Sequence, residues 1–120
     1  MATILVVDDT ETDRILMGKV VSASGNRPEY ATDGEEAVIK AKALKPALVL
    51  LDILMPKQDG FATCRALKKD TTTADIPVVM VTVKSAESDR FWAQQQGCQD
   101  YVTKPFAPQD LEGVIRRLVH

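Results

Sequence analysis

The sequence ALVLLDILMPKQDG, residues 47–60, decides the fold that we expect for this chain. Its apolar run from Ala47 to Leu51 is too short to span a membrane and is bounded by turn residues, which is typical of a strand buried on both faces of a sheet. Asp52 follows directly, and Pro56 and Asp59-Gly60 keep the chain from continuing as a strand. The sequence therefore predicts a carboxylate at the tip of a buried strand.

Length and composition limit the classes of protein to consider. With 120 residues, of which 45% are apolar and 27% charged, the chain has the size of one globular domain, which we expect to span residues 1–120. Its 15 Lys and Arg residues are scattered among 17 Asp and Glu residues, without the basic patch that nucleic-acid binding usually needs. We therefore expect no nucleic-acid partner.

No segment of the sequence indicates export or membrane insertion. The apolar run at residues 3–7 is too short for a signal-peptide core, and no segment approaches the roughly 20 apolar residues of a spanning helix. Cys64 and Cys98 lack the CxxC spacing of metal sites, and we expect free thiols, at least partly buried, in a reducing cytosol. The sequence thus predicts a soluble cytoplasmic protein.

Strand and helix patterns alternate along the rest of the chain. The other predicted strands are Thr3–Val7, an edge strand at Pro28–Ala31, Ile76–Thr82 and Gln99–Thr103. The predicted helices run from a cap at Thr10 or Thr12 to Gly25, from Glu35 to Lys45, Phe61–Lys69, Ala86–Gln96 with Ser85 as N-cap, and Pro108–Leu118. This alternation predicts the α/β class: a five-stranded parallel sheet with right-handed crossovers and helices on both faces.

Two of the predicted helices have patterns that need the structure to test them. In the first helix, Ile15, Leu16 and Val20 are predicted to share one apolar face. In the fourth helix, Phe91 and Trp92 are adjacent and point about 100° apart, so they cannot share a face. We expect at least one of these two rings to be exposed or only partly covered, either through loose packing or because this helix binds a partner.

Polar side chains stand at the ends of four of the five predicted strands. Asp8 and Asp9 follow the first strand, Asp52 follows the third, Thr82 ends the fourth and Lys104 follows the fifth. Ligands of such sheets bind outside the carboxyl ends of the strands, so we expect these groups to converge. Taken singly, each has a simpler interpretation, such as a helix cap for either of the first two acids. Their joint placement favours one site.

Three carboxylates in one crevice would repel one another unless a cation lay among them. Mg²⁺ is the natural candidate because it prefers oxygen ligands. Carboxylates can also act as nucleophiles and become phosphorylated. The charge of a phosphoryl group on one aspartate would be met by Mg²⁺, by the ammonium group of Lys104 and by the hydroxyl group of Thr82. The site chemistry therefore indicates phosphoryl transfer onto a carboxylate.

Five motifs identify a family resemblance that covers essentially the whole chain. They are VVDD (6–9), DGEEA (33–37), LLDILMP followed by DG (50–60), IPVVMVT (76–82) and DYVTKPF (100–106). In this order and at these spacings, they resemble the receiver domains of two-component response regulators. The resemblance implies the flavodoxin-like strand order 2-1-3-4-5.

The resemblance also implies a role for each site residue. Asp52 would be the phosphoacceptor, Thr82 the switch hydroxyl, and Tyr101 the aromatic ring that moves inward with it. The implied Mg²⁺ ligands are Asp8, Asp9, Asp52 and the backbone carbonyl of Leu54. The implied phosphate ligands are the backbone N–H of Val83 and the side chain of Lys104. The resemblance also implies a cis peptide bond between Lys104 and Pro105.

The implied partners are proteins. A histidine kinase or phosphotransfer protein would supply the phosphoryl group, and a downstream target would bind the face formed by the fourth helix, fifth strand and fifth helix. The chain resembles stand-alone regulators of twitching-motility and chemotaxis-like systems. Val83 stands where the family usually has a small residue, and we expect its side chain to narrow access to the phosphoryl group. We also expect Leu54 and Lys84 to tune the lifetime of the phosphorylated state.

Three alternative functions remain at the level of sequence. The protein could be a phosphate sink, or an interaction module that is not phosphorylated, although the intact acids, hydroxyl and lysine count against the second. Aspartate-based phosphatases use a similar set of site residues, but they carry a second acid at the position of Leu54. That acid would act as the general acid or base. We therefore predict a phosphoacceptor rather than a turnover enzyme.

Overall fold

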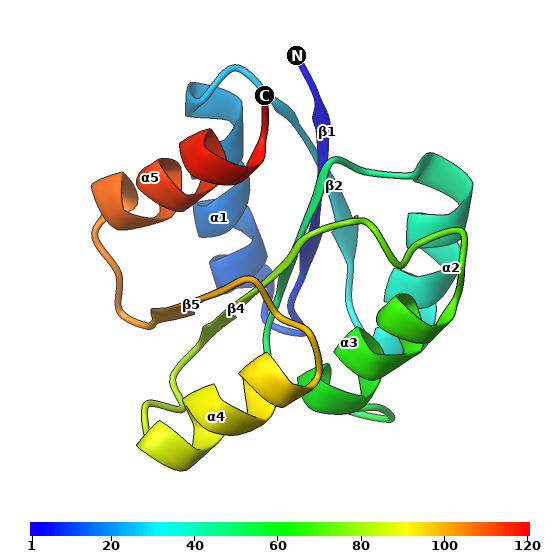
Figure 1. Cartoon of the computed structure of the whole chain (residues 1–120). Helices are drawn as coiled ribbons and strands as arrows, with labels where there is room; N and C mark the ends of the chain where they lie inside the picture. Colours follow the sequence, from blue (N-terminus) through cyan, green and yellow to red (C-terminus); the bar gives the residue numbers. More distant parts are fainter.

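The five strands form one parallel sheet in the spatial order β2-β1-β3-β4-β5 (Figure 1). In this computed structural model, which describes residues 1–120, a helix follows each strand. The order and the parallel pairing confirm the predicted flavodoxin-like arrangement. The strands are β1 (Thr3–Val7), β2 (Arg27–Ala31), β3 (Leu48–Leu51), β4 (Val78–Thr82) and β5 (Asp100–Thr103).

The helices cover both faces of the sheet, with α1 and α5 on one face and α2, α3 and α4 on the other (Figure 1). Parallel strands need such crossovers, because each strand must start again at the same end of the sheet. No helix combines the length and the apolar composition needed to cross a membrane. The helices are α1 (Glu11–Ala23), α2 (Gly34–Leu44), α3 (Gly60–Lys69), α4 (Glu87–Gln95) and α5 (Pro108–Leu118).

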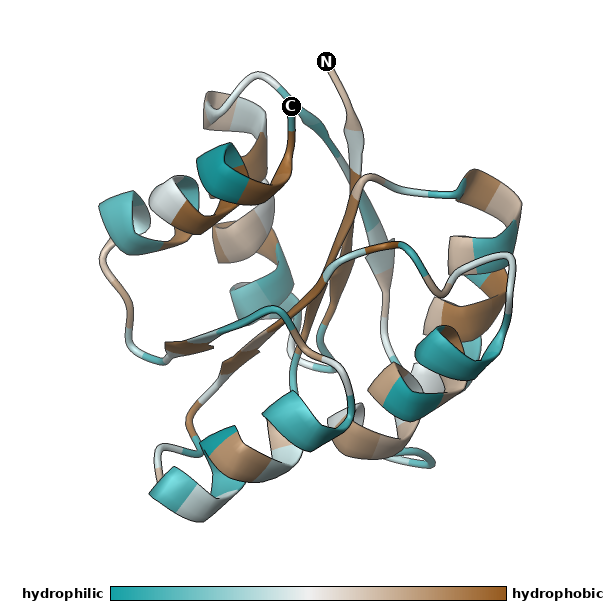
Figure 2. Cartoon of the chain, viewed as in Figure 1, coloured by the Kyte–Doolittle hydropathy of each residue, from teal (hydrophilic) through white to brown (hydrophobic).

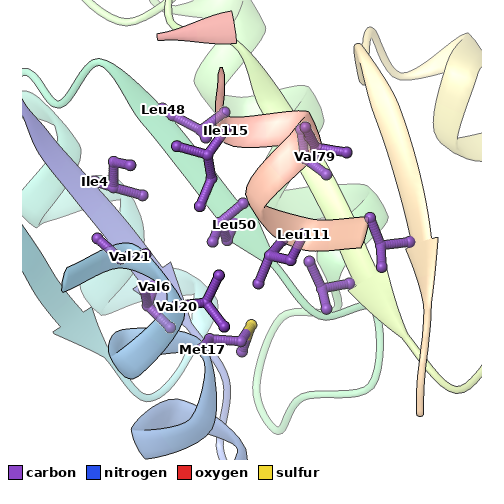
Figure 3. Close-up of a cluster of buried hydrophobic side chains, with 13 residues drawn as sticks. Ile4, Val6, Met17, Val20, Val21, Leu48, Leu50, Val79, Leu111 and Ile115 are labelled. Carbon is purple, nitrogen blue, oxygen red and sulfur yellow. The ribbon is translucent and has the colours of Figure 1, made fainter. Parts of the chain in front are cut away.

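Successive residues of the three central strands, β1, β3 and β4, point into two hydrophobic cores. On β1, Ile4 and Val6 lie in the core beneath α1 and α5, which Figure 3 shows, whereas Leu5 and Val7 lie in the core beneath α2, α3 and α4. All four side chains are fully buried. Figure 2 shows hydrophobic residues gathered in the strands and polar residues along the helices. Burial on both faces explains why β1, β3 and β4 appear in the sequence as continuous apolar runs.

The face that α1 packs on the sheet differs from the predicted one. Ile15 and Leu16 are exposed, and the buried stripe is formed by Met17, Val20 and Val21. At 100° per residue, Ile15 points about 160° away from Met17, on the opposite side of the helix, and Leu16 about 100° away, at the edge of the buried stripe. The prediction of an Ile15, Leu16 and Val20 face was wrong for its first two members.

Helix α4 starts one residue later than predicted, and its aromatic pair is exposed as expected. Its N-cap is Ala86 rather than Ser85, and the backbone N–H of Ala86 donates to the Asp89 carboxylate at 3.3 Å. Phe91 and Trp92 are both 55% exposed and touch edge to face, with ring centroids 5.9 Å apart. Only Ala93 of this helix is buried, which leaves α4 as the most loosely packed helix.

Candidate functional site

Strand register brings Asp8 and Asp52 together at the carboxyl edge of the sheet, where the parallel strands end. Val7 pairs with Leu51, so the two aspartates are the next residues on adjacent strands. The N–H of Asp52 donates to the carbonyl of Val7 at 3.1 Å, which extends the pairing by one step. Asp8 is fully buried and Asp52 nearly so. Two acids thus lie side by side with little access to bulk water.

The last two strands bring Thr82 and Lys104 to the same edge. Thr82 pairs with Thr103, and the N–H of Lys104 donates to the carbonyl of Thr82 at 2.8 Å. Thr82 is fully buried. The Lys104-Pro105 peptide bond is cis. The chain therefore turns away from the sheet immediately after the lysine.

The ammonium group of Lys104 is the centre of the site. Its Nζ donates to Asp8 Oδ2 at 2.6 Å, to Asp13 Oδ2 at 2.8 Å and to Asp52 Oδ2 at 3.0 Å. The lysine side chain is 10% exposed. A lysine has three N–H donors, and all three are used here on carboxylates. The geometry therefore fixes the three acids around one cation.

The electrostatics of this cluster leave an excess of negative charge. Burial raises the pKa of Asp8, against the opposing hydrogen bond from Lys104. Burial alone would lower the pKa of Lys104, but the hydrogen bonds to Asp13, Asp8 and Asp52 raise it above its ordinary value. The lysine therefore carries its proton at neutral pH. Three carboxylates and one ammonium give a formal charge of −2 when all are ionised.

Asp13 is a site residue that the sequence reasoning missed. It lies in the first turn of α1, where an acid is ordinarily explained by the helix dipole. Its place one turn after Asp8 and Asp9, on the helix that leaves the carboxyl edge, was the available signal. Its contact with Lys104, 91 residues away in the chain, depends on the assembled sheet.

The residues at this edge are suited in kind to a hard divalent cation. Asp8 and Asp52 offer carboxylate oxygens on either side of the Lys104 ammonium, and the negative excess would be offset by a second cation. The carbonyl of Leu54 accepts no hydrogen bond within the chain, which leaves it available as a ligand. Asp9 is exposed, and no three acidic, His or Cys side chains are gathered into a preformed metal cluster. Binding of a cation would therefore require the exposed Asp9 side chain to join the other ligands.

An open cavity of about 530 Å³ borders these groups. Its lining includes Asp9, Leu54, Phe61 and Lys84. Val83 does not contribute to this lining, and its side chain is exposed. Leu54 and Lys84 therefore lie beside Asp9 on the open side of this edge, and the narrowing of access by Val83 stays a prediction.

The backbone of Lys84 links Thr82 to Tyr101. The N–H of Lys84 donates to Thr82 Oγ1 at 3.4 Å, and the Tyr101 hydroxyl donates to the carbonyl of Lys84 at 2.6 Å. The Arg90 guanidinium lies 4.7 Å from the centre of the Tyr101 ring. Burial, together with the negative charge of Asp89, raises the pKa of Tyr101 to about 12. The two successive peptide units that flank the Cα atom of Lys84 thus connect the predicted switch hydroxyl with the predicted switch ring.

Replacing Tyr101 with Phe should remove the donor to the Lys84 carbonyl. We expect the free energy of unfolding to fall by about 1 kcal/mol, the usual worth of a hydrogen bond between neutral groups. Urea unfolding followed by circular dichroism would measure it. Tyr30→Phe is the matched control, because the Tyr30 hydroxyl makes no hydrogen bond within the chain and its loss should change stability little. Equal effects of the two replacements would contradict a structural role for the Tyr101 hydroxyl.

This combination of fold and site defines a class of signalling domain. The family model of the response regulator receiver domain matches residues 4–116. The chain belongs to the response regulator receiver domain family, and it is a component of two-component signal transduction.

Individual relatives agree with this assignment. Protein PilH of Pseudomonas aeruginosa is 40% identical over 119 residues, which cover 99% of this chain and 98% of that protein. The chemotaxis protein CheY4 of Vibrio cholerae superposes with a TM-score of 0.93 at 27% identity, covering 99% of each chain. The receiver domain of the sensor histidine kinase PA1611 from Pseudomonas aeruginosa, solved with a magnesium ion coordinated in its active site cleft, has a TM-score of 0.90 at 26% identity, covering 98% of this chain and 96% of that one.

Other relatives are longer proteins. The chain spans 47% of a probable transcriptional regulator of Porphyridium aerugineum and 48% of the phosphatase-synthesis regulator PhoP of Bacillus subtilis, with identities of 40% and 37% over 97% of this chain. This chain therefore shares the receiver domain with these longer proteins, and the transcriptional activities in their names are not assigned to it.

Proposed function

We propose that Asp52 accepts a phosphoryl group from a phosphohistidine of a histidine kinase or phosphotransfer protein. The observation that supports this most is the contact of Asp52 Oδ2 with the Lys104 ammonium at 3.0 Å, beside the buried Asp8. A carboxylate oxygen attacks phosphorus, the P–N bond of the donor breaks, and the released imidazole takes up a proton. The product is an acyl phosphate on Asp52.

The other site residues offset the charge of the bound phosphoryl group. In this proposal Lys104 turns its ammonium from the carboxylates to a phosphoryl oxygen, while the Thr82 hydroxyl and the Val83 N–H donate to the others. Mg²⁺, when bound by Asp8, Asp9, Asp52 and the Leu54 carbonyl, would supply the remaining positive charge. Leu54 provides no second acid, so the domain acts as a phosphoacceptor and not as a turnover phosphatase.

The partner-binding consequence follows from the link through Lys84. Drawing the Thr82 hydroxyl toward a phosphoryl group would disturb the N–H side of Lys84, and through this residue the carbonyl that the Tyr101 hydroxyl binds, and would release the ring to move. The face formed by α4, β5 and α5 would then bind a downstream target differently. We place this domain in the cytoplasm and propose that it works as a stand-alone regulator in a motility or chemotaxis-like pathway.

Mass spectrometry of the intact protein tests the acceptor. After incubation with Mg²⁺ and acetyl phosphate, we expect one adduct of about 80 Da, which chelation of Mg²⁺ prevents. Asp52→Asn should form no adduct. Asp75→Asn is the matched control, because Asp75 is an exposed aspartate away from the site, and it should be labelled like the parent.

Two outcomes would contradict the proposal. Labelling of Asp52→Asn at the parent rate would place the phosphoryl group elsewhere. Absence of labelling in the parent, with Mg²⁺ binding verified by titration, would favour an interaction module that works without phosphorylation.

A further inference from the structure

Cys64 and Cys98 form a thiol pair that the phosphoacceptor site does not use. Their Sγ atoms are 3.2 Å apart, although 34 residues separate them in the sequence. Cys64 lies on α3 and is buried, and Cys98 lies in the turn between α4 and β5 and is half-buried. A disulfide has an S–S distance of about 2.05 Å, so the sulfurs need to approach by roughly 1 Å.

The backbone on both sides of Cys98 holds its sulfur against α3. The N–H of Cys98 donates to the carbonyl of Ala93 at 3.1 Å, and the N–H of Gln99 donates to the carbonyl of Val78 at 2.8 Å. Gly97 precedes it with φ of +98°, a conformation that a residue with a side chain rarely adopts. These contacts fix the backbone of Cys98 beside α3, so the fold itself brings the two cysteines together.

The environment of the pair favours thiolate chemistry. The hydrogen bond with Cys98 lowers the pKa of Cys64 against the effect of burial, and the positive charge of Lys68 acts in the same direction. The same contact raises the pKa of Cys98. Either sulfur can be the hydrogen-bond donor. The contact therefore favours the thiolate on Cys64, and the shared proton can pass between the two sulfurs.

Cys98 also has access to small reagents. It lines an open cavity of about 190 Å³ together with Arg90 and Tyr101. A hydroperoxide is small enough to reach the sulfur through such an opening. Cys64 itself is fully buried.

We propose that Cys64 and Cys98 are a redox-sensitive pair, which a hydroperoxide converts to an intramolecular disulfide joining α3 to the start of β5. The Cys98 thiol passes its proton to Cys64 across the 3.2 Å contact and attacks a peroxide oxygen as the thiolate; the O–O bond breaks, and Cys98 becomes a sulfenic acid as water or an alcohol leaves. The Cys64 thiolate then attacks the Cys98 sulfur and expels hydroxide, which takes up the remaining proton as water. Two thiols are oxidised and one hydroperoxide is reduced. The bond would tie α3 to the strand that carries Tyr101, independently of whether Asp52 is phosphorylated.

Hydrogen peroxide and mass spectrometry test this proposal. After peroxide treatment and alkylation of the remaining thiols, we expect the protein to lose about 2 Da, to take up no alkylating reagent and to yield a peptide linking Cys64 to Cys98. Dithiothreitol should restore both thiols. Urea unfolding should have a higher midpoint in the oxidised protein than in the reduced one, because the bond restricts the unfolded chain.

Two variants separate the two sulfurs. Cys64→Ala should leave Cys98 without its partner, so that peptide mapping finds oxygen on Cys98 in steps of about 16 Da. Cys98→Ser should leave Cys64 buried and unoxidised over the same time. Disulfide-linked dimers in place of the intramolecular bond, or oxygen added to Cys98 of the parent with no loss of 2 Da, would overturn the proposal. The parent protein alone decides it if Cys64→Ala does not fold.

Discussion

Replacing Gly60 with alanine should destabilise the protein by about 3 kcal/mol or more, the upper range for overpacking a close contact. A Cβ atom at this position would lie 2.3 Å from the carbonyl oxygen of Asp52 and 2.7 Å from Cα of Ile53. Both are backbone atoms, which cannot move aside as the end of a side chain can. The N–H of Gly60 also donates to the carbonyl of Ile53 at 2.9 Å, so α3 begins in direct contact with the end of β3.

The matched control is Gly113→Ala on α5. A Cβ atom there meets nothing within 4 Å, and alanine is the better helix former, so this variant should gain about 0.5–1 kcal/mol. Urea unfolding of both variants beside the parent measures the two effects. The opposite signs are the expected result. A Gly60→Ala variant as stable as the parent would show that α3 can shift without cost at its start.

The Gly60 contact matters to the site because it involves the backbone of Asp52 itself. Relief of the clash must move either α3 or the residue that carries the carboxylate. Any Gly60→Ala protein that stays folded should therefore bind Mg²⁺ more weakly than Gly113→Ala. Isothermal titration at a temperature where both are folded would measure the difference.

The fold could be predicted from the sequence where a pattern depends on neighbours in the chain. The apolar runs at residues 3–7 and 47–51 gave β1 and β3, and the i, i+3, i+4, i+7 spacing after Pro108 gave the bounds of α5. In each case one local period leaves a single way to bury the apolar residues. The strand order came from the family resemblance and not from periodicity.

The remaining features of the fold depend on which face of a helix packs against the sheet. In α1, Ile15 and Leu16 are as apolar as the residues that are buried, so hydrophobicity alone cannot choose the face that packs. The choice follows from Met17, Val20 and Val21, which fit the sheet together. The contact between Phe91 and Trp92 likewise depends on α4 having only one buried residue.

The residues of the candidate site also divide into those that a local sequence pattern predicts and those that depend on packing. Asp8, Asp52, Thr82 and Lys104 could be predicted because strand ends meet at one edge of a parallel sheet. Asp13 was missed, because its position near the other acids is only a weak signal and its contact with Lys104 depends on the angle at which α1 leaves that edge. The Cys64–Cys98 contact could not be predicted, since it requires α3 to lie against the turn before β5.

Replacing Lys104 with methionine should destabilise the metal-free protein at neutral pH by about 3 kcal/mol, the lower range for removing one partner of a buried ion pair. Methionine keeps the length of the side chain but leaves Asp8, Asp13 and Asp52 without the cation that they share. Lys19→Met, at an exposed position on α1, is the control for loss of one positive charge and should change stability little.

Mg²⁺ should then reduce the loss in Lys104→Met. The three carboxylates of the variant have a formal charge of −3, whereas the cluster in the parent has a formal charge of −2. A divalent cation should therefore bind the variant more tightly and stabilise its folded state more. Thermal unfolding with increasing MgCl₂, beside NaCl at matched ionic strength, separates binding from screening. We expect the unfolding temperature to rise more steeply with MgCl₂ in Lys104→Met than in the parent. A metal-free variant as stable as the parent would mean that protonation or solvent, and not the lysine, relieves the repulsion between the acids. An equal rise in both proteins would mean that the cation site lies apart from Lys104.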